Sequence, residues 1–158
     1  MTRPLPAHEL YQRVIIEHSR CPKNFHELDD ATYIEEGNNP LCGDRFKIYL
    51  QIDKDTIIEK ISFQGKGCSL SFASASMMTA NLKGKSVSEA MKISDEFYRL
   101  ILRSPGSEEK EDTLGKLKVF SGVWRYPSRI RCVSLSWHIV NRIFRETTQG
   151  MSLCMNSN

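Results

Sequence analysis

The sequence predicts an α+β fold in which a small antiparallel sheet of about three strands carries helices packed on one face. Apolar and polar residues alternate with a period of two in residues 45–65, in two runs separated by a turn. Long segments on both sides show helical spacing instead. A chain of 158 residues with 40% hydrophobic residues suits one core, so we expect a single domain over 1–150 and a flexible tail over 151–158.

The first elements are a helix and a short strand. Apolar residues at Leu10, Tyr11, Val14 and Ile15 form a helical stripe within residues 6–20, and we expect this helix to end before Pro22. A short strand is expected over residues 31–35, followed by a loop over 38–44.

A hairpin follows directly. Its first strand is expected to bury Phe46, Ile48 and Leu50 and to turn Tyr49 outward, because these residues alternate. "DKDT" makes the turn, and the second strand ends at "GKGC", where two glycines bring Cys68 to the start of a helix.

The second half of the chain is expected to be helical. The segment after Cys68 is rich in Ala, Ser and Met, and small residues allow a helix to lie close across the hairpin. Ser86 and Glu89 have the spacing of a capping box, which predicts one or two further helical pieces. Residues 103–116 are charged and predict an exposed connection before a short helix over 117–123. A long final helix is expected to carry Cys132 near its start.

Charge and hydropathy exclude several classes of function. The 22 basic and 19 acidic residues are spread along the chain, which argues against a nucleic-acid partner. No apolar stretch has the length of a signal peptide or a membrane span. We therefore expect a soluble cytoplasmic protein with no membrane partner.

The five cysteines predict metal or thiol chemistry, because an odd number without a secretion signal argues against a disulfide framework. Cys42 and Cys68 should meet at the open end of the hairpin, and Cys132 lies near the start of the last helix. Clustered thiolates need a cation, and Asp44 is placed to be a fourth ligand of a tetrahedral zinc ion. The alternative is three buried cysteines that act as small hydrophobic residues.

Three motifs carry a resemblance to a known family. "NNPLCGD", "GKGCSLSFASASMMT" and "YPSRIRCVSLSW" resemble the three cysteine motifs of the NifU/IscU/SufU family of iron–sulfur assembly proteins. Two features point to the SufU-type branch. Arg131 stands where scaffold members have a histidine, and the interval from Cys68 to Cys132 is long, 64 residues (132 − 68), with residues 103–116 at the place of the SufU-type insertion.

The resemblance implies a specific activity. It implies one zinc ion held by Cys42, Asp44, Cys68 and Cys132, with Cys42 accepting persulfide sulfur from a SufS-type cysteine desulfurase and passing it toward a downstream iron–sulfur scaffold. In the family mechanism a histidine of the desulfurase takes a place on the zinc and releases the cysteine. Mobility of the glycine-flanked loop independently favours Cys42 as the nucleophile.

Other roles are considered beside this one. The same ligands in a scaffold would hold iron or a transient [2Fe–2S] cluster, and a non-catalytic zinc adaptor would dock on the desulfurase without carrying sulfur. Arg129 lies three residues before Cys132 and is expected to hydrogen-bond the released thiolate or Asp44, unless it is simply solvated. A cysteine peptidase is not favoured, because no motif contains a histidine. The roles of Cys21 and Cys154, the oligomeric state and the downstream acceptor are not predicted.

Overall fold

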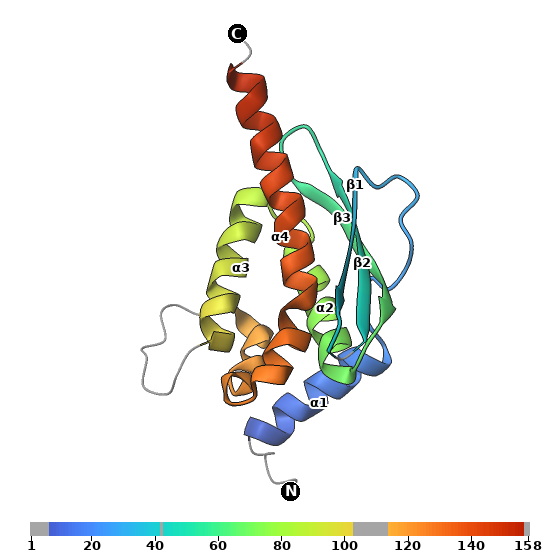
Figure 1. The fold of residues 1–158 in the computed structure, drawn as a ribbon, viewed down its shortest axis with the longest axis vertical. Coiled ribbons are helices and arrows are strands. Elements are labelled where there is room, and N and C mark those ends of the chain that lie inside the picture. Colours follow the sequence, from blue (N-terminus) through green and yellow to red (C-terminus); the bar gives the residue numbers. More distant parts are fainter. Residues whose placement is uncertain (1–6, 42, 103–113, 157–158) are drawn as a thin grey trace, which may run out of the picture.

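The computed structural model describes residues 7–41, 43–102 and 114–156 (Figure 1). A three-stranded antiparallel sheet lies beside a group of helices, which confirms the predicted α+β class. None of the helices in the described ranges is long and apolar enough to cross a membrane. The elements in chain order are α1 (Ala7–Arg20), β1 (Tyr33–Asn39), β2 (Asp44–Ile52), β3 (Ile58–Lys66), α2 (Ser69–Leu82), α3 (Val87–Leu102), the 3₁₀ helices η1 (Gly115–Phe120) and η2 (Val123–Arg125), and α4 (Pro127–Asn156).

The sheet has the strand order β1-β2-β3, so the predicted hairpin forms its centre and one edge. β1 starts at Tyr33 and continues to Asn39, four residues beyond the expected end at residue 35 (39 − 35). Its polar end still forms a strand because the backbone of Asn39 pairs with that of Asp44. Both ends of the loop expected over 38–44 therefore belong to strands, since β1 continues to Asn39 and β2 begins at Asp44.

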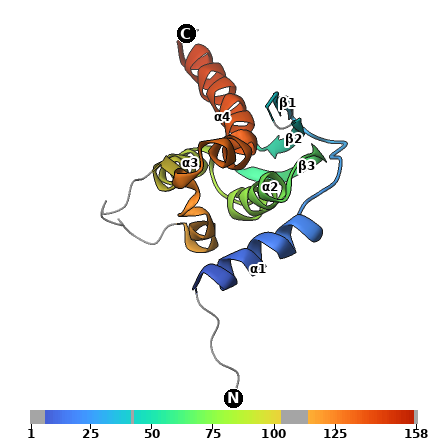
Figure 2. The same cartoon turned by 60° about the horizontal axis from the view of Figure 1, so that its bottom comes forward.

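The inner face of the sheet packs against α2 and α4 (Figure 2). Phe46, Ile48 and Leu50 are fully buried there, as the alternation predicts. Tyr49 was expected to face outward into solvent, but it is buried, and its hydroxyl donates a hydrogen bond of 2.8 Å to Oε1 of Gln64 on β3. A polar partner on the neighbouring strand therefore allows a tyrosine to be buried on the outer face.

The long helix α4 approaches β1 closely. A Cβ atom on Gly37 would lie 2.7 Å from Cγ1 of Ile139, so only glycine leaves space for the helix. Beside this contact, Nη2 of Arg142 donates a hydrogen bond of 2.6 Å to the carbonyl oxygen of Glu36. These contacts fix α4 on the sheet, and α4 in turn positions Cys132.

Most helix boundaries follow the sequence signals. α1 ends at Arg20, before Pro22, and the backbone N–H of Glu89 donates a hydrogen bond of 3.1 Å to Oγ of Ser86 at the start of α3. Residues 117–123 form parts of two 3₁₀ helices instead of one short helix. Most of the predicted exposed connection, residues 103–113, lies outside the described residues. α4 continues to Asn156, past the expected domain end at residue 150, and the flexibility of the tail stays a prediction.

Candidate metal centre

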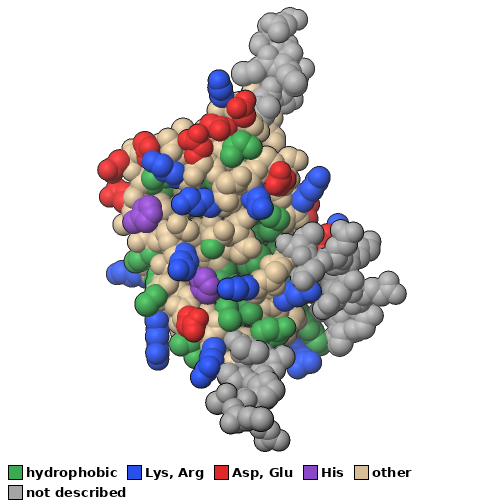
Figure 3. Space-filling model, turned by 180° about the vertical axis from the view of Figure 1, so that it is seen from behind, with side chains coloured by type: hydrophobic (Ala, Val, Ile, Leu, Met, Phe, Trp, Pro, Cys, Tyr) green, Lys and Arg blue, Asp and Glu red, His purple; other side chains and the backbone are tan. Residues whose placement is uncertain are grey.

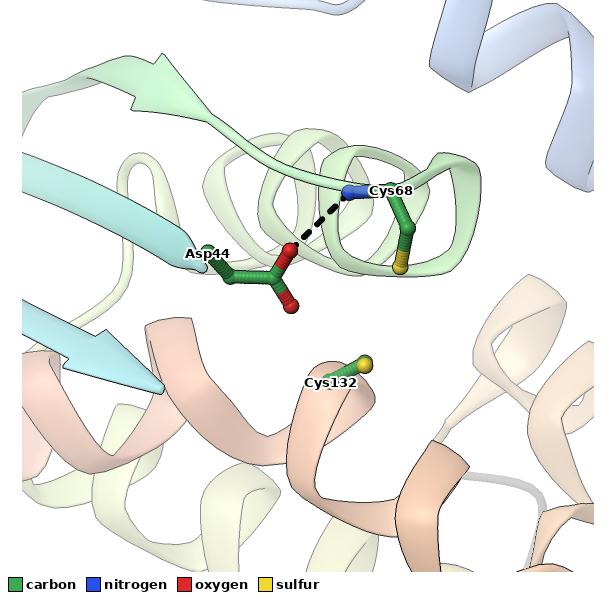
Figure 4. A group of neighbouring side chains, drawn as sticks. All are labelled: Asp44, Cys68 and Cys132. Atoms are coloured by element: carbon green, nitrogen blue, oxygen red, sulfur yellow. Dashed lines mark hydrogen bonds between the residues drawn. The ribbon is translucent and has the colours of Figure 1, made fainter. Parts of the chain in front are cut away.

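Three elements bring Asp44, Cys68 and Cys132 to one point (Figure 4). Asp44 begins β2, Cys68 directly precedes α2, and Cys132 lies in the second turn of α4. One ligand atom of each residue lies within 4.8 Å of the other two. The structure thus brings together three of the four predicted ligands, and their role as metal ligands stays a prediction.

Asp44 has one carboxylate oxygen without a partner. The residue is only 1% exposed, and its Oδ1 accepts a hydrogen bond of 3.0 Å from the backbone N–H of Cys68. Oδ2 is buried and has no hydrogen-bond partner among the residues that the structure describes. Burying a carboxylate oxygen without a partner is costly, so this position favours a cation between Oδ2 and the two thiols.

Cys68 is held at the start of α2. Phe72, one turn later, packs edge-on against Phe46 with ring centroids 5.4 Å apart, which fixes this end of the helix on the sheet. The Sγ atom of Cys68 lies 3.5 Å from Oγ of Ser71, which also donates a hydrogen bond of 2.9 Å to the carbonyl oxygen of Cys68. The positive end of the helix favours negative charge at the Cys68 sulfur.

The position before Cys68 requires glycine, because the neighbouring atoms leave no room for a side chain. A Cβ atom on Gly67 would lie 3.0 Å from Oδ1 of Asp44 and 3.1 Å from Cζ of Phe46, and it would collide with Oγ of Ser71. The sequence predicts a glycine role here through backbone turning. The structure shows that the missing side chain leaves room for the Asp44 carboxylate.

Cys132 is positioned by packing between α2 and α4. Oγ of Ser74 on α2 donates a hydrogen bond of 2.5 Å to the carbonyl oxygen of Val133 and accepts one of 3.1 Å from Nε1 of Trp137. Both serine contacts are buried, so they hold the first turns of α4 firmly against α2. Cys132 itself is buried, with 6% of its surface exposed.

Cys42 lies outside the described residues, but the turn on both sides of it is described. The backbone N–H of Gly43 donates a hydrogen bond of 2.9 Å to the carbonyl oxygen of Asn39, and that of Leu41 donates one of 3.3 Å to its Oδ1. Gly43 has φ of 73°, a conformation that favours glycine. The described residues on either side of Cys42, Leu41 and Gly43, thus lie in turns, and Gly43 leads directly to Asp44.

Asn39 is a functional candidate that sequence reasoning missed. It is 6% exposed, its Oδ1 accepts a hydrogen bond from Leu41, and its Nδ2 is buried with no hydrogen-bond partner in the described part of the chain. An Asn followed by Pro40 is a common start of a side-chain-capped turn, and this signal could have identified it.

Arg129 does not contact Asp44. Its guanidinium carbon lies 4.5 Å from the ring centroid of Tyr126, and the side chain is exposed. Its expected hydrogen bond to a released thiolate stays a prediction. Cys21 is exposed and lies outside the cluster, and the side chain of Cys154 is not among those described.

An apolar groove lies at the start of α4, the helix that carries Cys132. Its volume is about 590 Å³, and it runs between α1, the 3₁₀ helices and the start of α4. Two arginines lie at the groove, each with its guanidinium over an aromatic ring, Arg125 over Trp124 and Arg129 over Tyr126. The lining residues are Tyr11, Gln12, Ile15, Leu70, Val119, Phe120, Ser121, Gly122, Val123, Arg125, Tyr126 and Arg129.

The donor set fits zinc. Two thiols and a carboxylate oxygen are ordinary zinc ligands, and ligand atoms at roughly 2.0–2.3 Å from one tetrahedral ion must lie close to one another. The mutual separations of 4.8 Å or less, together with the unpartnered Oδ2 of Asp44, meet this requirement with small adjustments. A cysteine from the adjacent turn would complete four ligands.

Comparison with known proteins agrees with the fold and the cysteine pattern. Residues 10–133 match the family model described as the NifU-like N-terminal domain. The chain is 38% identical over 135 residues to the zinc-dependent sulfurtransferase SufU of Bacillus subtilis, with 84% of this chain and 88% of that protein covered. It is 35% identical over 144 residues to the iron–sulfur cluster assembly scaffold protein IscU of Streptococcus pyogenes, with coverage of 91% and 88%.

A solved structure gives the same assignment. The crystal structure of a putative iron–sulfur cluster assembly scaffold protein for the SUF system from Fervidobacterium islandicum superposes with a TM-score of 0.75 at 32% identity, covering 86% of this chain and 97% of that one. The chain belongs to the NifU-like N-terminal domain family, and the resemblance seen in the three cysteine motifs is confirmed.

Proposed function

We propose that this member of the family is a zinc-dependent sulfurtransferase of iron–sulfur cluster assembly. It accepts sulfur on Cys42 from the persulfide of a SufS-type cysteine desulfurase and passes it to a downstream scaffold. The observation that carries the proposal is the meeting of Asp44, Cys68 and Cys132 beside the turn of Cys42, with one carboxylate oxygen buried and unpartnered. The relative named as a zinc-dependent sulfurtransferase supports the same activity.

Cys42, Asp44, Cys68 and Cys132 would hold the zinc ion. When bound, zinc keeps its cysteine ligands deprotonated near neutral pH, where a free thiol is mostly protonated. The protein supplies three of these ligands from a strand, a helix start and a long helix, all of which are packed on the core. Cys42 comes from the turn, so it is the ligand that can leave with the least disturbance of the fold.

The transfer itself is a thiol–disulfide type of exchange. The Cys42 thiolate attacks the outer sulfur of the donor's persulfide, a new sulfur–sulfur bond forms on Cys42, and the sulfur–sulfur bond of the donor breaks. The electron pair of the broken bond leaves with the donor cysteine, which becomes a thiolate. The step needs no external oxidant or reductant, because sulfur is exchanged between two thiols.

The surface around the turn suits a protein donor. Leu41, next to Cys42, is 68% exposed, and Tyr126 at the groove is 49% exposed. Exposed apolar residues beside a groove of about 590 Å³ favour a protein contact. Arg125 and Arg129 would face acidic groups of the donor, which gives the encounter a preferred orientation.

A scaffold is the second candidate, because the relative from Streptococcus pyogenes is named as a scaffold and is 35% identical. In that role the same ligands would hold a transient [2Fe–2S] cluster. Arg131, in the place of the scaffold histidine, argues against it. A zinc adaptor that docks on the desulfurase without carrying sulfur is the third.

One assay separates the three roles. We would measure sulfide release from L-cysteine by the cognate desulfurase with a thiol reductant, with and without the zinc-loaded protein. We expect a several-fold stimulation that is lost in Cys42→Ala and kept in the control Cys21→Ala, whose thiol is exposed but outside the cluster. Partial stimulation by Cys42→Ala would indicate an adaptor. No stimulation by the wild type would contradict the transferase, and anaerobic cluster reconstitution would then test the scaffold.

A further inference from the structure

A second cleft lies away from the metal centre. It has a volume of about 390 Å³ and is formed by the end of α1, the residues after it, the second half of α2 and η1. Met77, its first lining residue on α2, is nine residues after Cys68 (77 − 68), which corresponds to about 14 Å along a helix. The lining residues are His18, Lys23, Asn24, Met77, Ala80, Asn81, Lys83 and Lys116.

The described residues that line this cleft carry only positive charge. Three lysines line it, and no lining residue is acidic. The two salt bridges among the described residues are Lys60–Asp30 and Arg99–Glu96, so neither neutralises a lysine of the cleft. On the face shown in Figure 3, positive and negative side chains are separated. Lys and Arg side chains cover the middle and lower parts, and most Asp and Glu side chains lie near the upper end.

His18 is fixed within this positive cleft. Its Nδ1 lies 2.7 Å from Oγ of Ser76, and the same oxygen accepts a hydrogen bond of 2.7 Å from the backbone N–H of Lys23. Burial lowers the pKa of His18, and the nearby charges of Lys116 and Lys23 lower it further, while Glu17 acts in the opposite direction. The ring is therefore neutral near pH 7 and offers a hydrogen bond without adding to the repulsion.

The base of the cleft is rigid. Nδ2 of Asn24 donates a hydrogen bond of 3.0 Å to Oγ1 of Thr79, and the Asn24 carbonyl oxygen accepts one of 3.0 Å from the backbone N–H of Phe63. Asn24 has φ of 57°, which these contacts on α2 and β3 hold in place. Nδ2 of Asn81 donates a hydrogen bond of 2.7 Å to the carbonyl oxygen of Met77. The lysines thus project from a fixed frame, as a preformed site requires.

We propose that this cleft binds a small phosphorylated molecule, with its phosphate groups at Lys23, Lys83 and Lys116 and its apolar part against Ala80, which is exposed. Lysine binds phosphate as a point charge, and three lysines around one concavity suit adjacent phosphate groups. The volume of about 390 Å³ falls in the usual range of small-molecule sites. A long nucleic acid would instead need cations along an extended surface.

One of the three lysines, Lys116, belongs to the charged stretch over residues 103–116. It ends the charged 103–116 stretch that marks the SufU-type insertion, and η1 carries it to the cleft beside α1 and α2. The inference goes beyond the proposed sulfur transfer, because no lining residue belongs to the metal centre.

The test is a titration of the zinc-loaded full chain with ADP and, separately, with inorganic pyrophosphate at about 0.15 M salt. Calorimetry would give the affinities, and NMR would follow the His18 ring. The double variant K83Q/K116Q should weaken ADP binding by about tenfold or more, because it removes two charge-assisted contacts. The control K54Q/K92Q removes two exposed lysines outside the cleft and should change the affinity by less than about twofold.

The two ligands and the NMR signal distinguish the outcomes. Weaker binding of pyrophosphate than of ADP would support the apolar contact, and equal binding would place only the phosphates in the cleft and overturn that contact. Bound anion should raise the pKa of His18, because a neighbouring negative charge favours the imidazolium. The proposal is overturned by no binding, by equal losses in both double variants, or by an unchanged His18 signal. If only the desulfurase moves that signal, the cleft contacts protein instead.

Discussion

Ser74 and Asp44 are both buried polar residues, with 0% and 1% of their surfaces exposed. The Ser74 hydroxyl both donates and accepts a hydrogen bond, whereas one carboxylate oxygen of Asp44 has no partner among the described residues. The hydroxyl donates to the carbonyl oxygen of Val133 and accepts from Nε1 of Trp137. Asp44 has one oxygen bound to the Cys68 N–H and the other unpartnered. The Ser74 hydroxyl is therefore satisfied without a ligand, whereas Oδ2 of Asp44 has no partner among the described residues, and the proposed zinc ion would supply one.

The first test of this comparison removes the centre of the complete region. Trp137 is fully buried and stacks on Phe97 with ring centroids 4.2 Å apart. We expect Trp137→Ala to lower the free energy of unfolding by about 3–5 kcal/mol, because it leaves a cavity and removes the hydrogen bond that the Ser74 oxygen accepts from Nε1 of Trp137. Denaturant unfolding would measure the loss. It should have the same size with and without zinc, and a loss seen only in one form would contradict the separation of the two regions.

The second test acts on the incomplete region. Asp44→Asn keeps the shape of the side chain and an acceptor for the Cys68 N–H but removes the charge. We expect the metal-free protein to be no less stable, because a buried unpaired charge is lost. We expect zinc affinity to fall by about tenfold or more, which lowers zinc-dependent stabilisation by about 1.4 kcal/mol for each factor of ten.

Competition with a chelator and thermal unfolding would measure both effects of Asp44→Asn. The control is Asp95→Asn, an exposed carboxylate on α3 that should alter neither quantity. A metal-free protein made clearly less stable by Asp44→Asn would show that this end is satisfied without a cation.

The third test asks whether the absence of a side chain at Gly67 is needed for the Asp44 carboxylate to bind zinc. Gly67→Ala would place a Cβ atom 3.0 Å from Oδ1 of Asp44, so we expect a loss of about 1–3 kcal/mol in stability together with weaker zinc binding. Gly122→Ala is the matched control, because its Cβ atom would meet nothing within 4 Å. Unchanged zinc affinity in Gly67→Ala would mean that the carboxylate position is not set by this contact.

The smallest effect concerns pH. Burial lowers the pKa of His18 and of His138, and nearby positive charges, Lys116 and Lys23 at His18 and Arg145 and Arg142 at His138, act in the same direction. As the pH falls through the ordinary value of 6.5, the unfolded chain takes up these protons first, so stability should decrease toward acid pH.

Because both rings are partly exposed, the histidine effect should stay below about 1 kcal/mol for each residue. Unfolding of the double variant H18Q/H138Q between pH 7 and 5 would measure it, and its profile should be flatter than that of the wild type. The difference between the two profiles should not depend on zinc, because the rings bond Ser76 and Tyr98, outside the metal centre.

Much of this arrangement could be predicted from local sequence signals. The alternation over residues 45–65 identified the hairpin, and its geometry placed Asp44 near Cys68, with Cys132 joining from the last helix. The capping signal at Ser86 also predicted the start of α3, and the small residues after Cys68 predicted α2. In each case the signal lies in the segment that forms the element.

The rest depends on partners far away in the sequence. The polar end of β1 forms a strand because β2 pairs with it. Tyr49 can be buried because Gln64 accepts a hydrogen bond from its hydroxyl. Residues 117–123 contain apolar positions that fit a short helix, but their hydrogen bonds follow the tighter 3₁₀ pattern. Asn39 was missed because its importance lies in burial, which its own polarity does not suggest.

The separation of Asp44, Cys68 and Cys132 along the sequence determines when they can come together during synthesis. Asp44 and Cys68 meet across a hairpin, but Cys132 is 88 residues after Asp44 (132 − 44) and belongs to the last helix. During translation the sheet and α2 emerge early, while Cys132 emerges only when the first two turns of α4 have left the ribosome. A chain that stops before α4 lacks Cys132, so binding of zinc at the proposed site would show that synthesis has reached the final helix.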